Sequence, residues 1–179
     1  MDTKLVVGNI ADVETECLVV IAIDHGEKQK NEPKLAIKDG AADKAAAELI
    51  SAGEVTGKQA EAVMLHRPQG LKAKRLLVAG GGKAKEFSHT AVRKAAGAAV
   101  RFLKPKMIKT CAFVLPELSS GVEDSMRAVV EGAFIANFDP DTYRSDRKDL
   151  QMKEITIIAP NGSDQGKLQQ ELEQARIIG

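Results

Sequence analysis

The sequence predicts an α/β domain in which helices cover both faces of a parallel or mixed sheet of about six strands. In the second half of the chain, apolar runs of strand length alternate with amphipathic, alanine-rich segments. The chain is 44% hydrophobic but only 3% aromatic, so its core must be aliphatic, which suits a buried sheet under alanine-rich helices. The length of 179 residues fits a single domain, 1–179.

Six segments have the pattern of β-strands. The clearest is ECLVVIAI at 16–23, a continuous apolar run typical of a strand buried on both faces. Turn residues such as Gly, Pro and Asn follow several of these segments. The predicted strands are 3–7, 16–23, 61–66, 74–79, 109–115 and 153–159. The polar segment 24–33 contains Gly and Pro, and we expect it to be a loop.

Four segments have the composition and periodicity of helices. They are 41–52, 88–103, 121–138 and 164–179. In the second of these, Ser88 suits the N-cap position, and Gly97 indicates close packing because glycine costs stability inside a helix.

The last helix places Leu168, Leu172, Ala175 and Ile178 on one face. The chain supplies little after this helix for that face to pack against. We therefore expect the sequence to be a domain of a longer protein.

Composition excludes several classes of function. The 26 basic and 25 acidic residues nearly cancel, so the basic footprint of a nucleic-acid-binding protein is absent. Two local basic patches remain, which we interpret as solvated edges: Lys72, Lys74 and Arg75, and Arg101, Lys104, Lys106 and Lys109.

Cysteine usage and hydropathy predict a cytoplasmic protein without a membrane segment. Cys17 and Cys111 both lie in apolar runs and are interpreted as buried strand thiols rather than a disulfide framework. No secretory signal follows Met1, and the longest apolar run, 18–23, is far too short to span a bilayer.

The glycine run after the strand at 74–79 is the most suggestive local site. Gly80, Gly81 and Gly82 could turn the chain so that backbone N–H groups approach an anion, and Lys83 would add charge. The run satisfies neither the P-loop nor the dinucleotide-binding spacing. The competing interpretation is a tight strand-to-helix connection that binds no ligand.

No other set of residues forms a catalytic or metal-binding motif. His25, His66 and His89 show no H-E-x-x-H spacing and are interpreted as surface or loop residues. The acidic segment FDPDTYRSDRKD contains interleaved basic residues and does not match a calcium loop. We therefore predict no catalytic and no metal-binding residue in this chain.

The order of these segments resembles a known family. The chain contains the strand RLLVAGGGK, the helical RKAAGAAVR, the EGA step at 131–133 and the stretch from Phe138 to Ser145. Together these segments resemble the N-terminal domain of leucyl aminopeptidases, the cytosol aminopeptidase family. The resemblance covers essentially the whole chain, most clearly 74–148. Pro140 and Asp141 stand where the family usually has one residue, and Arg144 replaces its usual Lys. The ending QARIIG is similar to the start of the helix that enters the family's catalytic domain.

The resemblance implies a three-layer, macro-domain-like fold and a larger C-terminal catalytic domain that is absent from this chain. That domain would hold two divalent metals, manganese or zinc, and remove N-terminal amino acids from peptides. The family's N-T-D-A-E-G-R-L motif does not occur here, so no catalytic or metal residue is carried over and the chain alone is expected to be inactive. The resemblance further implies a hexameric parent, in which this domain serves assembly and access to the active site.

Two alternatives stay open at this point. A free-standing macro-like module could bind ADP-ribose or another phosphate ligand at the glycine turn. A DNA-contacting regulatory domain is a lesser alternative, because some bacterial members of the family bind DNA, although the near-neutral charge argues against it.

Overall fold

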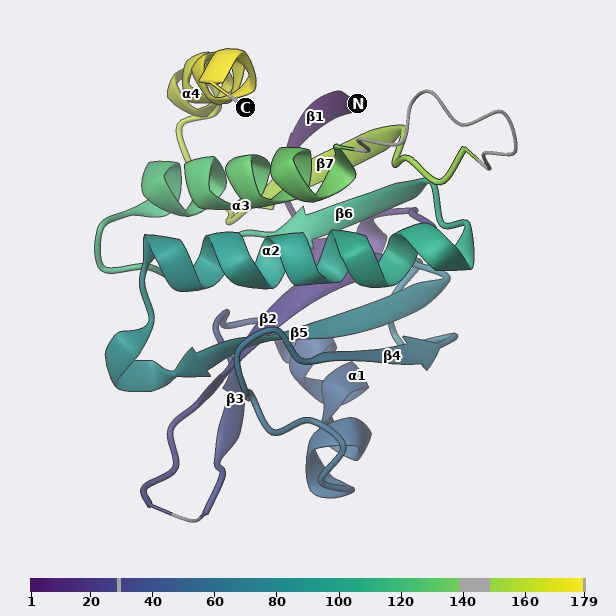
Figure 1. Cartoon of the computed structure of the whole chain (residues 1–179), viewed down its shortest axis with the longest axis vertical. Coiled ribbons are helices and arrows are strands. Elements are labelled where there is room, and N and C mark those ends of the chain that lie inside the picture. Colours follow the sequence, from purple (N-terminus) through teal and green to yellow (C-terminus); the bar gives the residue numbers. More distant parts are fainter. Residues whose placement is uncertain (29, 139–148, 179) are drawn as a thin grey trace.

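The computed structural model describes residues 1–28, 30–138 and 149–178, and within them it shows a three-layer α/β fold (Figure 1). The described strands form one sheet: β1 (Asp2–Val7), β2 (Leu18–Asp24), β3 (Pro33–Leu35), β4 (Ala62–His66), β5 (Arg75–Lys83), β6 (Thr110–Val114) and β7 (Glu154–Ala159). The described α-helices are α1 (Gly40–Ser51), α2 (His89–Leu103), α3 (Val122–Asn137) and α4 (Gln165–Ile178). The described residues also contain three short 3-10 helices: η1 (Ile10–Asp12), η2 (Ala84–Glu86) and η3 (Lys104–Lys106).

The sheet is mixed, as the sequence predicts, with the strand order β1-β7-β6-β2-β5-β4. The first five of these strands run parallel, while β4 pairs antiparallel with β5 and β3 pairs antiparallel with the end of β2. Parallel pairing requires crossover connections, which α2 and α3 provide. Each crossover helix therefore runs antiparallel to the strands and ends at the edge of the sheet where the parallel strands begin.

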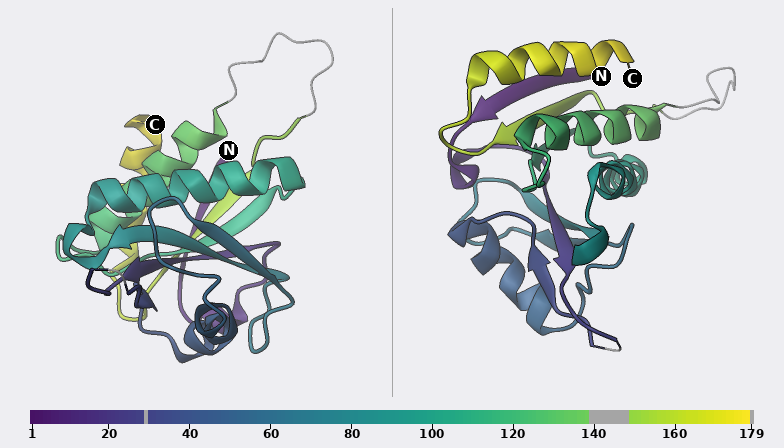
Figure 2. Two further views of the ribbon diagram at one scale, coloured as in Figure 1. Left: turned by 60° about the horizontal axis from the view of Figure 1, so that its bottom comes forward. Right: turned by 90° about the vertical axis from the view of Figure 1, so that its left-hand side faces the viewer.

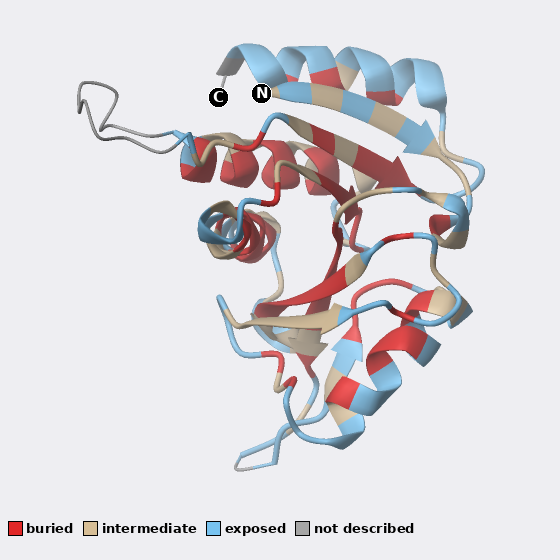
Figure 3. Ribbon diagram, turned by 90° about the vertical axis from the view of Figure 1, so that its right-hand side faces the viewer, coloured by how far each residue is buried: buried red, intermediate tan, exposed pale blue. Residues whose placement is uncertain are grey.

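Alternation along each strand divides the core between the two faces of the sheet. In β2, Val19 and Ile21 face the larger cluster, which α2, α3 and α4 cover, while Leu18 and Val20 face the smaller cluster under α1. Figure 2 shows α1 on the opposite side of the sheet from α2 and α3, and Figure 3 shows the buried stripes of the helices turned toward the strands. The aliphatic core predicted from composition is thus split into two layers.

Two glycines allow α2 and α3 to approach closely. A Cβ on Gly132 would lie 2.2 Å from the carbonyl oxygen of Arg93, and one on Gly97 would lie 3.3 Å from the carbonyl oxygen of Gly132. The prediction that Gly97 permits close packing is confirmed, although Gly132 is the tighter of the two contacts. Ser88 holds the N-cap position of α2 as predicted, but its side chain makes no capping hydrogen bond.

Three expectations need correction. The short strand β3 was missed, because three residues beginning with a proline carry no readable alternation. The glycine run does not turn, because β5 continues through it to Lys83. The last helix does have a partner: Leu168, Leu172 and Ala175 are each 1% exposed within the larger cluster.

None of the helices within the described ranges combines the length and the apolar character that crossing a bilayer would require.

Candidate functional site

The predicted glycine site lies in the second half of β5, where the segment before β4 crosses the strand. A Cβ on Gly80 would lie 1.7 Å from the carbonyl oxygen of Lys58, and one on Gly81 would lie within 3.0 Å of Phe87 and Ile21. Gly82 has a φ of +88°, in the left-handed region that favours glycine. The glycines are therefore explained by close packing around a strand.

Two backbone N–H groups of this run already have partners within the domain. The N–H of Gly80 donates to the carbonyl of Glu61 at 2.8 Å, and that of Gly82 donates to the carbonyl of Gly57 at 2.8 Å. An anion cradle needs such N–H groups to point at the ligand. Anion binding at Gly80, Gly81, Gly82 and Lys83 stays a prediction, but the turn on which it was based is absent.

The ammonium group of Lys83 is paired within the protein. Its Nζ lies 2.6 Å from Oδ2 of Asp24, a residue that is 2% exposed. Oδ1 of Asp24 accepts hydrogen bonds from the backbone N–H groups of Gly26 and Glu32, both at 2.8 Å. The hydrogen bond from Lys83, followed by that from Glu32, lowers the pKa of Asp24 from its ordinary value of 3.8 to about 2. This arrangement holds the β2–β3 hairpin to the end of β5.

A hollow of about 240 Å³ lies at the carboxyl ends of the parallel strands β1, β6 and β7. This edge is where open α/β sheets usually bind ligands. Its polar rim contains Asn9, Lys38, Glu117 and Asn161, while Asp39 caps the N-terminus of α1. The volume is below the usual range of ligand pockets, and among the described lining residues there is no histidine or cysteine. Both carboxylates at its rim already have partners within the domain: Asp39 caps α1, and Oε2 of Glu117 lies 3.7 Å from Nζ of Lys38.

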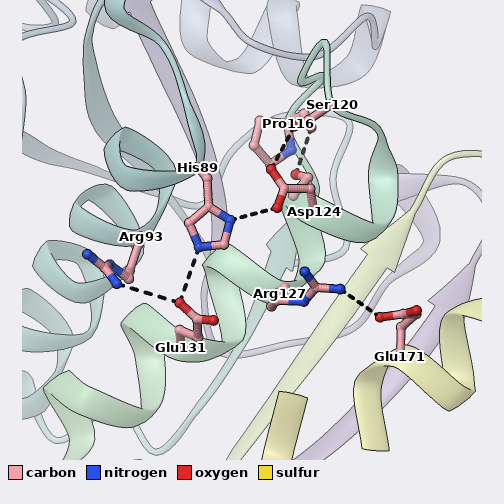
Figure 4. Close-up of polar contacts among 9 residues, drawn as sticks. His89, Arg93, Pro116, Ser120, Asp124, Arg127, Glu131 and Glu171 are labelled. Atoms are coloured by element: carbon pink, nitrogen blue, oxygen red, sulfur yellow. Dashed lines mark hydrogen bonds and ion pairs between the residues drawn. The ribbon is translucent and has the colours of Figure 1, made fainter. Parts of the chain in front are cut away.

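A cluster of polar and ionisable side chains joins the start of α2 to α3 (Figure 4). Nδ1 of His89 lies 2.8 Å from Oδ1 of Asp124, and Nε2 lies 3.2 Å from Oε2 of Glu131. Arg93 approaches the same oxygen of Glu131 at 3.7 Å. Ser120 donates to the other carboxylate oxygen of Asp124 at 2.6 Å. The hydrogen bond from Ser120, and then that from His89, lowers the pKa of Asp124.

This cluster is built to connect helices rather than to perform nucleophilic catalysis. In a serine triad the histidine lies between the serine and the carboxylate. Here Asp124 lies between Ser120 and His89, so the imidazole is not placed to take the proton of the serine. His89 was expected to be a surface or loop residue; it lies at the start of α2, its side chain is 28% exposed, and both of its ring nitrogens face carboxylates.

The remaining predicted residues contribute to the packing and pairing within the fold. Cys17 and Cys111 are buried thiols, as predicted, and burial raises the pKa of Cys17 to about 12. Several members of the basic patches contact the protein itself: Lys72 pairs with Asp12, and Lys104 donates to backbone carbonyls at the end of α3. Most of the acidic segment, including Asp139, Asp141 and Asp146, lies outside the described residues, as does the Tyr143–Arg144–Ser145 part of the family stretch.

The sequence analysis did not identify two polar residues whose side chains form hydrogen bonds with backbone groups far away in the sequence. Asn137, at the end of α3, accepts a hydrogen bond from the backbone N–H of Met152 at 2.6 Å and donates to its carbonyl at 3.2 Å. Glu16 accepts from the N–H groups of Lys109 and Thr110. Burial acts to raise the pKa of Glu16, but these hydrogen bonds together outweigh it and keep the pKa below the usual value. Neither residue carries a local signal, because its partners are distant in the sequence.

Comparison with known proteins gives a consistent match. The family model described as the N-terminal domain of the cytosol aminopeptidase family matches residues 19–147. A probable cytosol aminopeptidase of Koribacter versatilis is 43% identical over 185 residues, covering 94% of this chain and 36% of the relative. One from Acidobacterium capsulatum is 35% identical, covering 100% of this chain and 37% of the relative. The chain thus spans little more than a third of the length of these curated relatives.

Solved structures show the same fold. A mutant of tomato leucine aminopeptidase aligns with a TM-score of 0.68 at 17% identity, covering 98% of this chain and 35% of that one. The bottromycin maturation enzyme BotP, in a complex with manganese, aligns with a TM-score of 0.59 at 19% identity, covering 90% of this chain and 29% of that one.

Proposed function

This chain belongs to the cytosol aminopeptidase family, whose N-terminal domain it matches, and from that premise we propose that it is the non-catalytic N-terminal domain of a longer, two-metal leucyl aminopeptidase. The longer protein would remove N-terminal amino acids from peptides in the cytoplasm. The family match supports this function and neither of the two alternatives, an independent ADP-ribose-binding module or a DNA-contacting regulator.

One observation carries the proposal. Two relatives align with 94% or more of this chain, yet the aligned part is only 36–37% of their own length. Because the matching family model is that of an N-terminal domain, the remaining length of a similar protein would follow α4. The peptidase chemistry is assigned to that remaining part.

We assign the two divalent metals, manganese or zinc, to the catalytic domain, because the family's metal-binding motifs belong there. The solved structure of BotP with manganese supports a metal-dependent parent. Within the ranges that the structure describes, no group of three or more His, Cys, Asp or Glu side chains is arranged to hold a metal ion. No step of the reaction is therefore derived from residues of this chain.

The role proposed for this domain is to assist assembly, as a hexamer in the full-length parent, and to shape access to the active site. A stiff scaffold suits that role. The glycine contact between α2 and α3 and the His89 cluster hold the helical layer in one arrangement. A rigid domain can position a neighbouring domain without taking part in the chemistry.

The proposal is tested on the natural gene product. Its intact mass should lie well above the 19.2 kDa of this chain. With Mn²⁺ added, the longer product should hydrolyse leucyl p-nitroanilide, and the 179-residue chain should not. A natural product of 19.2 kDa, or hydrolysis by the chain alone at the rate of the longer product, would overturn the proposal.

A further inference from the structure

Exposed apolar side chains gather at one edge of the domain. The parallel topology places the ends of α2, α3 and α4 at the edge where the parallel strands begin. Four of the five large hydrophobic residues that are exposed among the described residues follow or end these helices. They are Met107 (52% exposed), Ile135 (57%), Phe138 (73%) and Ile177 (85%). The fifth, Val6, lies near the opposite end of β1 and is less exposed, at 37%.

An open hollow of about 460 Å³ lies at this edge, between the end of α3 and the starts of β1 and β7. It is lined by Met1, Phe134, Ile135, Asn137, Phe138 and Gln151. We call the apolar members of this set, together with Ile177, the amino-edge patch: Met1, Phe134, Ile135, Phe138 and Ile177. Exposed apolar side chains that gather at one edge of a fold commonly mark a contact with another protein surface.

Two polar side chains at this edge are already paired inside the domain. The side-chain amide of Asn137 makes both of its hydrogen bonds with the backbone of Met152. Nζ of Lys104 donates to the carbonyls of Ala136 and Asn137 at 3.2 and 3.3 Å. Covering the patch would therefore remove apolar side chains from water without leaving these polar groups unpaired, which keeps the desolvation cost low.

The place where the chain ends indicates what covers the patch. The end of α4 and the N-terminus lie at this same edge of the domain (Figure 2). The curated relatives have nearly two thirds of their length beyond the part that matches this chain. Any segment that follows α4 in a longer product would start beside the patch.

We infer that the amino-edge patch is the surface on which the C-terminal catalytic domain docks. This inference rests on the proposed function, because it needs a chain that continues past α4. A second copy of the chain fits the patch less well. Stable association of two separate proteins usually requires roughly 20–30 residues on each side, whereas a tethered partner can hold a smaller surface because its effective concentration is high.

The test uses the same double substitution, Ile135→Ser with Phe138→Ser, in the longer gene product and in the 179-residue chain. Both side chains are exposed here, so the thermal midpoint of the chain alone should change little. In the longer product the variant should lose apolar burial between the domains. Limited proteolysis after residue 178 should then become about tenfold faster or more. Val6→Ser, an exposed apolar residue at the other end of β1, is the matched control and should leave that rate unchanged.

The outcomes separate this inference from the function on which it rests. A longer, active aminopeptidase whose proteolysis is unaffected by the double substitution overturns the docking surface and keeps the function. A longer but inactive product with faster proteolysis overturns the function and keeps the docking surface. A natural product of 19.2 kDa overturns both. Sedimentation of the chain alone should show a monomer; a dimer that the double substitution dissociates would assign the patch to a second copy and overturn the inference.

Discussion

The α2–α3 pair and the β2–β3 hairpin are held in place by opposite means. Between the helices, the decisive feature is a missing side chain, since Gly132 leaves room for the carbonyl oxygen of Arg93. At the hairpin, the decisive feature is a buried carboxylate, since Asp24 gathers two backbone N–H groups and the ammonium of Lys83.

This difference indicates which of the two regions can accommodate an amino-acid substitution. A backbone-to-backbone contact cannot yield without moving two helices, and close-packed interiors resist such movement. A polar contact near the surface can be partly replaced by water, because the side chain of Lys83 is 38% exposed. Substitutions in the helix pair should therefore cost more than substitutions at the hairpin.

The largest effect is expected for Gly132→Ala. Its Cβ would lie 2.2 Å from the carbonyl oxygen of Arg93, so one helix must shift. Alanine normally stabilises a helix relative to glycine, but here overpacking should outweigh that gain and lower the free energy of unfolding by about 3 kcal/mol. The thermal midpoint, followed by circular dichroism, should fall by roughly 6–12 °C.

Gly97→Ala is the matched control for that substitution. Its nearest contacts would be 3.3 Å from the carbonyl oxygen of Gly132 and 3.4 Å from Nη1 of Arg101, which small movements can relieve. The gain in helix propensity offsets much of this cost, so the free energy of unfolding should change by less than about 1 kcal/mol. Equal losses for the two variants would contradict the assignment of the tight contact to Gly132.

The hairpin should respond less strongly. Asp24→Ala removes a buried acceptor and leaves the N–H groups of Gly26 and Glu32 without their partner. We expect a loss of about 2 kcal/mol in urea unfolding at neutral pH. Glu117→Ala removes an exposed carboxylate 3.7 Å from Lys38 and should be close to neutral. A loss at Glu117 as large as that at Asp24 would show that burial does not decide the effect.

The same substitution has a pH signature. The pKa of Asp24 is lowered in the folded protein from 3.8 to about 2, so its stabilising contribution is fully present above pH 3.8. That contribution is lost as the pH falls through the window from 3.8 to 2. The difference in stability between the native chain and Asp24→Ala should therefore shrink across this window, and a difference that grew on acidification would contradict the pairing.

The smallest effect is expected at the rim of the helix pair. His89→Ala removes the contacts to Asp124 and Glu131, which lie on α3, while the histidine side chain is already 28% exposed. The expected loss is about 1 kcal/mol in thermal or urea unfolding. His66→Ala changes an exposed histidine at the end of β4 and serves as the control. Identical behaviour of the two variants would show that the cluster does not fasten the helices.

Local sequence patterns were sufficient to predict most of the helices and strands. The strand β2 and the helix α2 were predicted close to their actual bounds, because burial of a strand or helix face leaves a periodic pattern in the sequence. The strand β3 left no such trace in three residues. The glycines of β5 were misread because a run of glycines is compatible both with a turn and with a strand that another segment crosses.

The polar pairs could not be predicted in the same way. The carboxylates that face His89 lie 35 and 42 positions further along the chain. Lys83 and Asp24 are 59 positions apart. No motif of fixed spacing links them, since each pair forms only because the sheet and its crossover helices bring separate elements together.

The sequence by itself therefore determined the α/β class, the aliphatic core and the apolar face of α4. The tertiary structure alone decided what that last face packs against, why Gly80, Gly81 and Gly132 have no side chain, and which charges are paired. The physical reason is range: hydrophobic periodicity is a property of neighbouring residues, whereas close approach and charge pairing depend on elements that meet only in the folded chain.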